Sequence, residues 1–185
     1  MTHPTNLPAD FNVEEWHLVA SALDVELDMM AEVLRAVVYG GAGVSYFTPF
    51  SLGEARAFWV EKVLPVMRAG TRRVLVSRVN DRIVGTVQLS VDTPPNQRHR
   101  AEVVKLLVHP DARRRGIARA LMIALEDLAR NEGRTLLTLD TVTGSSAEDL
   151  YTSLGYRTAG VIPRYARGAL TPELEDATFM YKELS

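Results

Sequence analysis

The sequence predicts an α/β (α+β) fold in which about four helices flank a mixed central sheet of about seven strands. An antiparallel hairpin and a strand–helix–strand unit are the two observations that predict it. The hairpin has strands at Arg73–Val79 and Ile83–Asp92, both rich in β-branched and aliphatic residues. They meet at Asn80-Asp81, a short turn signal that favours antiparallel pairing. This part of the sheet is therefore predicted to be antiparallel.

The strand–helix–strand unit makes the predicted sheet mixed. A hydrophobic strand at about Arg100–Val108 leads to an amphipathic helix at about Gly116–Glu132, and a buried strand follows at Leu136–Asp140. Strands joined by a helical crossover run parallel, and the connection is right-handed. By strand alternation, one face of the first strand is expected to hold Glu102, Val104, Leu106 and Val108.

Two further helices are predicted before the hairpin. The first lies behind a candidate cap at Ser21 and ends at the cluster Gly40-Gly41-Ala42-Gly43, which either ends the helix or leaves room for a ligand. The second opens with the capping box Ser51-x-x-Glu54, and Pro65 is expected to kink it or end it early. Its buried face is expected to hold Leu52, Ala55, Trp59, Val63 and Met67.

The remaining elements lie near the two ends of the chain. Residues 1–12 are predicted to form a loose N-terminal tail before a first short strand within Glu14–Val19. Near the other end, the sequence predicts a short helix from Ser145 or Ser146 to Gly155, strands near Tyr156–Ile162 and Ala177–Lys182, and a loop between them at 163–175. A chain of 185 residues fits one domain, so residues 1–185 are all assigned to it.

Composition excludes several classes of protein and of site. With 46% hydrophobic residues, 24% charged residues and a net charge of −2, nothing indicates a nucleic-acid or membrane partner. There is no cysteine, which excludes a disulfide scaffold, a thiolate zinc site and a cysteine nucleophile. The four histidines have no metal spacing, and we expect no metal. Without a signal-peptide pattern or a transmembrane stretch, a cytoplasmic protein is expected.

A basic, glycine-containing loop between the strand at Arg100–Val108 and the following helix is a candidate anion site. The first N–H groups of a helix lack intrahelical partners and carry partial positive charge. Gly116 lets a diphosphate approach the backbone closely, and small Ala118 keeps the next turn open. Full positive charge comes from Arg113, Arg114, Arg115 and Arg119. The residues therefore favour a pyrophosphate-bearing ligand, although an ordinary basic loop that caps a helix has the same pattern.

Two motifs resemble those of the GNAT superfamily of acetyl-CoA-dependent N-acetyltransferases. The loop lacks the GxxxxGK[ST] and GxGxxG patterns, but Arg113-x-x-Gly116-x-Ala118 is similar to the R/Q-x-x-G-x-G/A motif. Ala147-x-x-Leu150-Tyr151-x-x-x-Gly155-Tyr156 is similar to the stretch that follows the fifth strand in that superfamily. The order of predicted elements resembles the GNAT fold over nearly the whole chain. One departure is Gly144, which stands where many members have an asparagine that contacts the cofactor.

Shorter matches resemble the tabtoxin-resistance acetyltransferases within that superfamily. They are Arg100-Ala101-Glu102-Val103, Leu139-Asp140-Thr141 followed by Gly144-Ser145, and Gly40-Gly41-Ala42. The resemblance implies an enzyme, an acyltransferase that moves acetyl from acetyl-CoA directly to the amino group of a small acceptor. An amino-acid-like antibiotic or toxin is one candidate acceptor. A binding module that senses acyl-CoA without turnover, and an acetyltransferase for protein or peptide amines, stay open as alternatives, as do monomer and homodimer.

The GNAT resemblance also implies where acetyl-CoA binds. Its pantetheine arm would pair with backbone groups of Leu106, Leu107 and Val108, and the Val108 N–H would be the oxyanion donor. The pyrophosphate would bind at Arg113, Arg114, Arg115, Gly116, Ile117, Ala118 and Arg119.

Three side chains are candidates for the chemistry. The resemblance makes Tyr151 the general acid that protonates the departing thiolate, and the alternative is a tyrosine that only packs at the helix edge. Glu102 and Asp140 would be the carboxylates of the acceptor site. For Glu102 the alternative is an ion pair with Arg100 or Lys105. For Asp140 it is a cap for the turn at residues 143–145.

Overall fold

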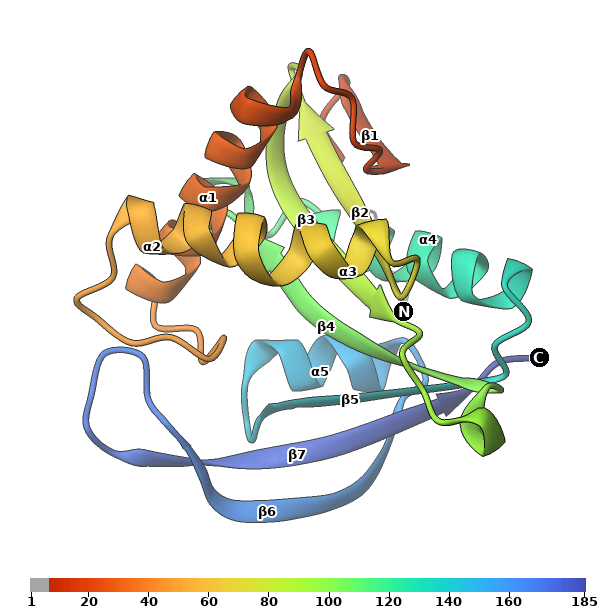
Figure 1. Cartoon of the computed structure of the whole chain (residues 1–185). Helices are drawn as coiled ribbons and strands as arrows, with labels where there is room; N and C mark the ends of the chain where they lie inside the picture. The colour runs from red at the N-terminus through yellow and green to blue at the C-terminus, as the bar shows by residue number, and fades with distance from the viewer. Residues whose placement is uncertain (1–6) are drawn as a thin grey trace.

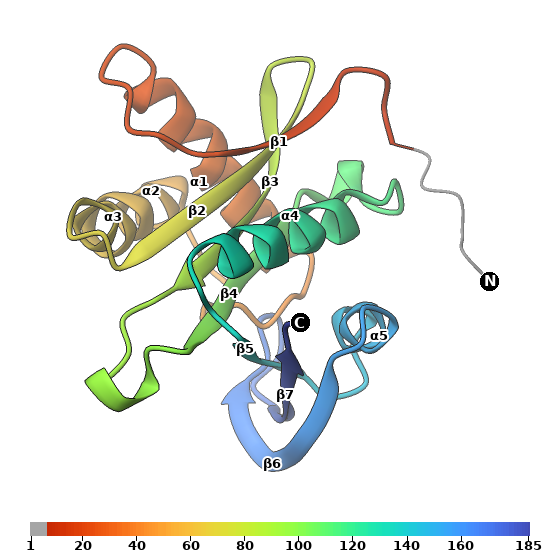
Figure 2. The same cartoon turned by 90° about the vertical axis from the view of Figure 1, so that its right-hand side faces the viewer.

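The computed structural model describes residues 7–185, which form a seven-stranded sheet with helices on both faces (Figures 1 and 2). The strand order is β1-β2-β3-β4-β5-β7-β6; β4 and β5 pair in parallel, and the other neighbours pair in antiparallel. The mixed α+β architecture predicted from the sequence is confirmed. The strands are β1 (Phe11–Glu15), β2 (Arg72–Val79), β3 (Arg82–Ser90), β4 (Arg100–Val108), β5 (Leu136–Val142), β6 (Arg157–Arg167) and β7 (Leu174–Glu183).

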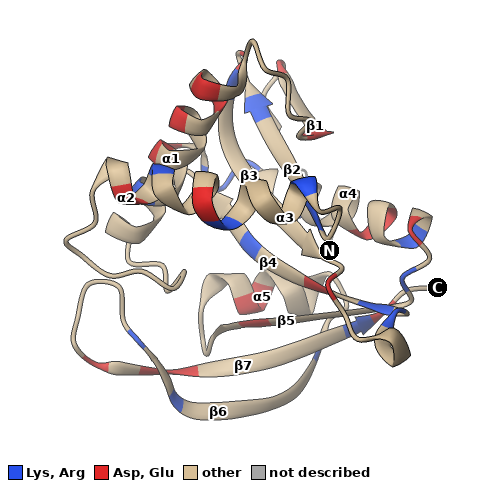
Figure 3. Ribbon diagram, in the orientation of Figure 1, with Lys and Arg blue, Asp and Glu red and all other residues tan. Residues whose placement is uncertain are grey.

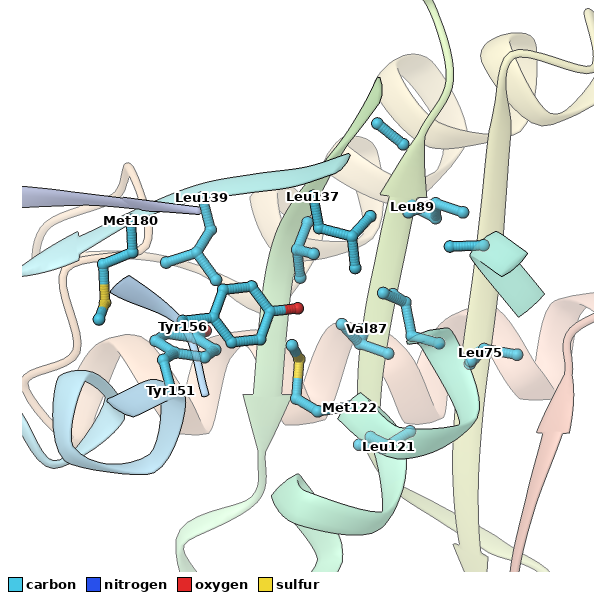
Figure 4. Close-up of a cluster of buried hydrophobic side chains, with 14 of the residues drawn as sticks. Leu75, Val87, Leu89, Leu121, Met122, Leu137, Leu139, Tyr151, Tyr156 and Met180 are labelled. Atoms are coloured by element: carbon cyan, nitrogen blue, oxygen red, sulfur yellow. The ribbon is translucent and has the colours of Figure 1, made fainter. Parts of the chain in front are cut away.

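Two hydrophobic clusters hold the helices against the two faces of the sheet. On one face the helix α1 and the run α2–α3 pack on β2, β3 and β4. On the other face α4 and α5 pack around Leu121, Leu125 and Tyr151, as Figure 4 shows in part. The helices are α1 (Leu23–Tyr39), α2 (Leu52–Ala57), a π-helical segment η1 (Phe58–Val63), α3 (Leu64–Arg68), α4 (Ile117–Asn131) and α5 (Ser146–Ser153), and short 3-10 turns lie at Pro95–Gln97 and Pro110–Ala112.

The first strand begins earlier than predicted. Residues 1–6 of the predicted tail lie outside the described residues, but Phe11 and Asn12 already pair with Val79 and Arg78 of β2. The expected strand at 14–19 is therefore wrong beyond Glu15. The strand begins here because Phe11 and Val13 alternate with polar residues and turn toward the core around α4.

The predicted second helix is a helical run in three parts. Its capping box is present, since the Ser51 hydroxyl accepts the Glu54 N–H at 3.1 Å and the Glu54 carboxylate accepts the Ser51 N–H at 2.8 Å. Pro65 does not end the run. The π-helical segment before it shifts the hydrogen-bond register, and the Leu64 N–H reaches the Trp59 carbonyl. Leu52, predicted to be buried, is 49% exposed because it lies in the first turn, on the solvent side.

Two other details of the helices and the last hairpin differ from prediction. Ser21 does not cap α1, whose N-cap is Ala22 without a side-chain hydrogen bond. The predicted loop at 163–175 is mostly strand, since β6 continues to Arg167 and β7 starts at Leu174. Pro163 is tolerated because β6 is the edge strand and its register shifts between Ile162 and Ala166.

The alternation along β4 breaks at Lys105. Thr86 pairs with Leu107 but Gln88 with Val104, so β4 carries one extra residue at this point, and Lys105 has a φ of 54°. After the bulge, Leu106 and Val108 join the cluster on the α4 side. Glu102 and Val104 lie on the opposite face. The expectation that these four residues share one face is therefore wrong.

A buried carboxylate ties α1 to the first two strands. Glu26, which is 9% exposed, accepts the Trp16 indole N–H at 2.7 Å and pairs with Arg78 of β2. Arg78 also pairs with Glu14 of β1 at 2.6 Å. Glu32 lies on the same helix, α1. It pairs with Arg82 at 3.2 Å, but its side chain is 59% exposed.

We predict that Glu26→Ala lowers the free energy of unfolding by about 3 kcal/mol, because it leaves the buried Trp16 N–H without an acceptor and the Arg78 guanidinium with Glu14 alone. Glu32→Ala is the matched control on the same helix and should change stability by less than about 0.5 kcal/mol. Urea unfolding measures both variants. Equal losses in the two would show that the Glu26 network contributes no more than a surface ion pair.

Candidate active site

The site is built where β4 and β5 diverge. These parallel strands pair only at Arg100–Glu102 with Leu136–Thr138, and β4 then continues for six residues without pairing with β5. Figure 1 shows the two strands close together at one end and apart at the other. Between the bulge at Lys105 and the end of β4, backbone groups on the β5 side thus have no strand partner. This fork is the part of the sheet that can receive an extended ligand.

A cleft of about 930 Å³ opens at the fork. It runs between the loop after α1, the far half of β4, the loop before α4, the end of β5 and the start of α5. Of the residues predicted from the sequence, the cleft is lined by Leu106, Val108, Arg113, Arg114, Gly116, Ile117, Ala118, Arg119, Asp140 and Tyr151. Three predicted residues, Glu102, Leu107 and Arg115, are not among the residues that line it. The Leu107 side chain packs in the cluster on the α1 side.

The N-terminus of α4 has the geometry expected of an anion site. Gly116 is its N-cap in the left-handed region, with a φ of 83°, and Arg114 is also left-handed, with a φ of 60°. This turn brings the first N–H groups of a 15-residue helix to the cleft. Arg119 donates to Ser153 Oγ at 2.6 Å, and Arg113 donates through Nε to the Val108 carbonyl at 3.2 Å.

The Val108 N–H is directed into the fork. The next residue, His109, donates its N–H to the Val84 carbonyl of β3 at 2.8 Å. Because successive N–H groups of a strand point to opposite sides, the Val108 N–H points away from β3, toward the side that β5 has left. A donor is therefore available at the point where β4 borders the cleft.

Tyr151 lies on α5 at the wall of the cleft. Ser145 caps this helix, its hydroxyl accepting the Glu148 N–H at 3.3 Å. The Tyr151 ring is 6% exposed and lies 5.7 Å from the Tyr156 ring (Figure 4). Burial, and to a smaller extent the negative charge of Asp140, raise the pKa of Tyr151 above its usual range. The hydroxyl therefore stays protonated throughout the neutral pH range.

Asp140 is an exposed carboxylate on the face of β5 opposite to Leu137 and Leu139. It does not cap the following turn: the Gly144 N–H goes to Glu148 Oε2 at 2.6 Å, and Ser145 caps α5. Within residues 7–185 the Asp140 carboxylate makes no side-chain hydrogen bond or ion pair. The capping alternative is thus wrong, and the group is available to a ligand.

Glu102 lies apart from this cleft. Neither ion pair considered for it forms, since Arg100 donates to Gln97 at 2.8 Å and the Lys105 ammonium donates to the loop after α1. Its charge acts instead on Arg72 of β2. Burial lowers the pKa of Arg72, and the negative charge of Glu102 partly opposes that shift. Glu102 does not line the cleft because it still pairs with Thr138 of β5, and the cleft opens only beyond this pair.

Two charged residues that sequence reasoning missed line the cleft, Lys105 and Glu175. The signal for Lys105 was present, because it is the one charged residue in the apolar run Val103–Val108. Glu175 stands at the start of β7, inside the predicted loop, and no local pattern marked it. A Cβ placed on Gly43 would lie 3.3 Å from its Oε2 atom. Part of the glycine cluster therefore makes room for a neighbouring side chain.

Two loops meet along one side of the cleft. The Thr48 N–H in the loop after α1 donates to the Ala169 carbonyl between β6 and β7 at 2.9 Å. A Cβ on Gly41, which has a φ of 82°, would lie 3.3 Å from Leu170 Cδ1. Figure 1 shows these loops approaching each other from opposite ends of the chain. Together they form a wall beside the fork, and the first of the two loops lines the cleft through residues 40–45.

A model of a known protein family matches more than half of the chain. The model of the acetyltransferase (GNAT) family matches residues 45–156. This range includes β4, the basic loop at Arg113–Gly116 (the anion loop), α4, β5 and α5. The chain belongs to the acetyltransferase (GNAT) family. Among curated proteins, human N-acetyltransferase 8 is 37% identical over 87 residues, which are 46% of this chain and 38% of that protein. Human N-acetyltransferase 8B matches to the same extent. The matched region thus spans well under half of either relative.

Solved structures share the fold over nearly the whole chain. An N-acetyltransferase from Staphylococcus aureus Mu50 matches with a TM-score of 0.77 and 18% identity, covering 96% of this chain and 100% of that one. The yncA protein of Salmonella typhimurium, solved with its cofactor acetyl-CoA, matches with a TM-score of 0.74 and 20% identity, covering 95% of each chain. These identities show the fold alone. The GNAT fold predicted from the sequence is confirmed; a relationship to the tabtoxin-resistance group is not shown.

Residues 7–185 contain neither a cluster of metal-ligating side chains nor a helix that could span a membrane. No group of three or more His, Asp or Glu side chains gathers there in a way that could hold a metal ion. No helix in this part of the chain is both long enough and apolar enough to cross a membrane.

We predict that Gly116→Val weakens the binding of coenzyme A at least about tenfold, because a β-branched side chain at this φ distorts the anion loop and fills the diphosphate position. Gly133→Val, at the other end of α4, is the matched control: its φ is 72° and a Cβ there would meet no atom within 4 Å. Both variants carry backbone strain, but only the first should lose affinity in calorimetric titration. Unchanged affinity in folded Gly116→Val would contradict the anion site.

Proposed function

We propose that this protein transfers an acetyl group from acetyl-CoA directly to the amino group of a small acceptor. The observation that carries the proposal is that one cleft joins the anion loop at Gly116, the fork of β4 and β5, Tyr151 and Asp140. Acetyl-CoA supplies an activated acetyl thioester. The chain contains no cysteine, so a relay of the acetyl group through a cysteine is excluded.

The anion loop and the fork would position acetyl-CoA. The α4 N-terminus with Arg114 and Arg119 would hold the diphosphate. The unpaired backbone of β4 beyond the bulge would hold the extended pantetheine arm, with Leu106 and Val108 at the cleft and Leu107 contributing backbone alone. The Val108 N–H then lies where it can donate to the carbonyl oxygen as negative charge develops. Of the predicted arginines, Arg115 contributes only long-range charge, because its side chain does not line the cleft.

Tyr151 would return a proton to the departing thiolate. Its raised pKa makes it a weaker acid than a phenol in water. The same burial also raises the pKa of a thiol formed beside it, because desolvation disfavours the thiolate as much as the phenolate. The two shifts act in the same direction, so they partly cancel in the transfer of a proton from the phenol to the thiolate. A proton donor in the cleft favours an enzyme over an acyl-CoA sensor, because a sensor needs no such donor.

Asp140 would face the acceptor amine. It is exposed, forms no ion pair or side-chain hydrogen bond within residues 7–185, and lines the same cleft as Tyr151. It can bind the acceptor as an ammonium ion or accept its proton through water. Glu102 can act on the acceptor only at longer range, through the charge of Arg72.

The wall formed by the two loops favours a small acceptor over a peptide. An extended protein segment would need a groove open at both ends, whereas the Thr48–Ala169 hydrogen bond ties the loop after α1, which lines the cleft at residues 40–45, to the loop between β6 and β7. The similarity of a few short segments to the tabtoxin-resistance group keeps an amino-acid-like antibiotic or toxin as one candidate acceptor. Figure 3 shows acidic and basic residues interspersed along helices and strands, which supports a small-molecule partner over a nucleic acid.

A thiol-release assay with acetyl-CoA tests the function over a panel of amines, amino acids and peptides. Release that depends on a small amine supports the proposal. Release only with peptides would establish a peptide acetyltransferase, and tight acetyl-CoA binding without release would establish a sensor.

We predict that Tyr151→Phe lowers kcat by about 10²–10⁴-fold, because it removes the proton donor and keeps the ring. Acetyl-CoA affinity should change little. Tyr156→Phe is the matched control: this ring packs against Tyr151 and is 3% exposed, but it does not line the cleft, so kcat should stay within about threefold. Steady-state kinetics and calorimetry measure both effects, and full activity of Tyr151→Phe would remove the general-acid role.

We predict that Asp140→Asn lowers kcat/KM for the acceptor at least about tenfold with acetyl-CoA affinity unchanged, because the neutral amide neither binds an ammonium ion nor accepts its proton. Glu102→Gln removes a carboxylate outside the cleft and should cost less than about threefold. Kinetics at varied acceptor concentration compare the two. A larger loss in Glu102→Gln would reverse the assignment of the two carboxylates.

A further inference from the structure

Lys105 stands on the bulge of β4, at the start of the fork. Its φ of 54° is in the left-handed region, which costs a residue with a side chain about 1 kcal/mol or more. Such strain persists only where surrounding contacts hold the residue in place, and it is often associated with function. The chain contains only three lysines, Lys62, Lys105 and Lys182, and Lys105 is the one that lines the cleft.

The partners of the Lys105 ammonium are all neutral. It donates to the Val44 carbonyl at 2.9 Å and to Ser45 Oγ at 2.9 Å, and it lies 5.9 Å from the centre of the Phe58 ring. Across residues 7–185, no carboxylate oxygen lies within 4 Å of it. Lys182, which is also half-buried, differs, since its ammonium pairs with Glu126 at 2.6 Å. Lys105 thus has a charge without a counter-ion.

This charge is partly withdrawn from water. Burial is the main effect on the Lys105 pKa and lowers it; the more distant charge of Asp140 opposes the shift, and Arg72 adds to it. An ammonium group has three N–H donors, and the two hydrogen bonds to the loop after α1 use two of them. Charges removed from water in proteins are normally paired. One donor and one full charge therefore remain for a ligand in the cleft.

We propose that Lys105 binds a carboxylate group of the acceptor, so that the protein selects acceptors carrying a carboxylate beside the amino group that is acetylated. The inference rests on the proposed acetyl transfer, and it narrows the acceptor class from small amines to amino-acid-like zwitterions. Lys105 is then a specificity-determining residue of the acceptor site.

The position of Lys105 favours the acceptor over acetyl-CoA as the source of the anion. The cations suited to a diphosphate, Arg114 and Arg119, lie in the loop and the helix that follow β4, beyond the end of the strand. Lys105 lies at the other end of the unpaired stretch, beside the loop after α1. Asp140 lines the same cleft and acts on Lys105 at longer range. Lys105 and Asp140 do not contact each other, so each can pair with a ligand. Lys105 matches the carboxylate of a zwitterion, and Asp140 matches its ammonium group.

The first test compares matched pairs of acceptors. Each of the common L-amino acids is assayed with acetyl-CoA beside its carboxamide, which keeps the amine and removes the negative charge. The expected ratio of kcat/KM, acid over carboxamide, is roughly tenfold or more in the wild type. In Lys105→Met this ratio should fall to about one, whereas Lys105→Arg should keep a preference for the acids. Lys62→Met is the control: Lys62 is exposed on η1, and its loss should leave the ratio unchanged.

The second test needs neither turnover nor a variant. Lys105 in the wild-type protein with coenzyme A is dimethylated with formaldehyde and borohydride, and peptide mass spectrometry follows the rate. N-acetyl amino acids, which have no amine to consume the reagent, should slow the modification of Lys105 at least severalfold. N-acetyl carboxamides should not, and Lys62 serves as the internal reference in the same digest.

The outcomes separate the two proposals. Acetyl transfer without a preference for acids, together with no protection of Lys105, would overturn the role of Lys105 and leave the acetyltransferase standing. Selective protection without any acetyl transfer would support a carboxylate site at Lys105 and contradict the enzyme. Absence of protection by every N-acetyl amino acid overturns the inference even if Lys105→Met fails to fold.

Discussion

The divergence of β4 and β5 is the constraint on which the rest of the site depends. Parallel strands pair evenly along their length, yet these two separate after the pair Glu102–Thr138. The crossover helix α4 begins where β4 ends, and α5 begins just beyond β5. A helix N-terminus, an unpaired strand backbone and the wall of α5 therefore converge on one gap. None of the three could reach an extended ligand if the strands stayed paired.

Buried ion pairs away from the cleft keep this fork in place. The Lys182 ammonium on β7 pairs with Glu126 of α4 at 2.6 Å and donates to the Leu154 carbonyl, after α5, at 2.7 Å. It joins the two helices that border the cleft to the strand beside β5. The Glu26 network fixes α1 against β1 and β2 in the same way. Charges that are paired hold the scaffold, whereas Lys105 and Asp140 line the cleft and form no ion pair within residues 7–185.

Chemistry in such a cleft depends on excluding water as much as on individual groups. Tyr151 is almost fully buried, and the loops after α1 and between β6 and β7 close one side through Thr48 and Ala169. A lower local dielectric strengthens each interaction with developing charge and raises the pKa of phenol and thiol together. In the proposed reaction the charges of the acceptor would then count strongly, because an unpaired charge in the cleft adds to the cost of binding a ligand that does not match it.

The sequence by itself determined the elements whose signals are local. The turn at Asn80-Asp81, the limits of β4, the caps at Ser51 and Ser145 and the glycine at Gly116 follow from backbone preferences within a few residues. Only the tertiary structure decided the rest. The bulge at Lys105, the edge position that allows Pro163 in β6 and the meeting of Thr48 with Ala169 depend on pairing between distant segments. Glu102 lies outside the cleft because it still pairs with Thr138 of β5, whereas Lys105 lies on a bulge beyond that last pair, and alternation along the chain could reveal neither position.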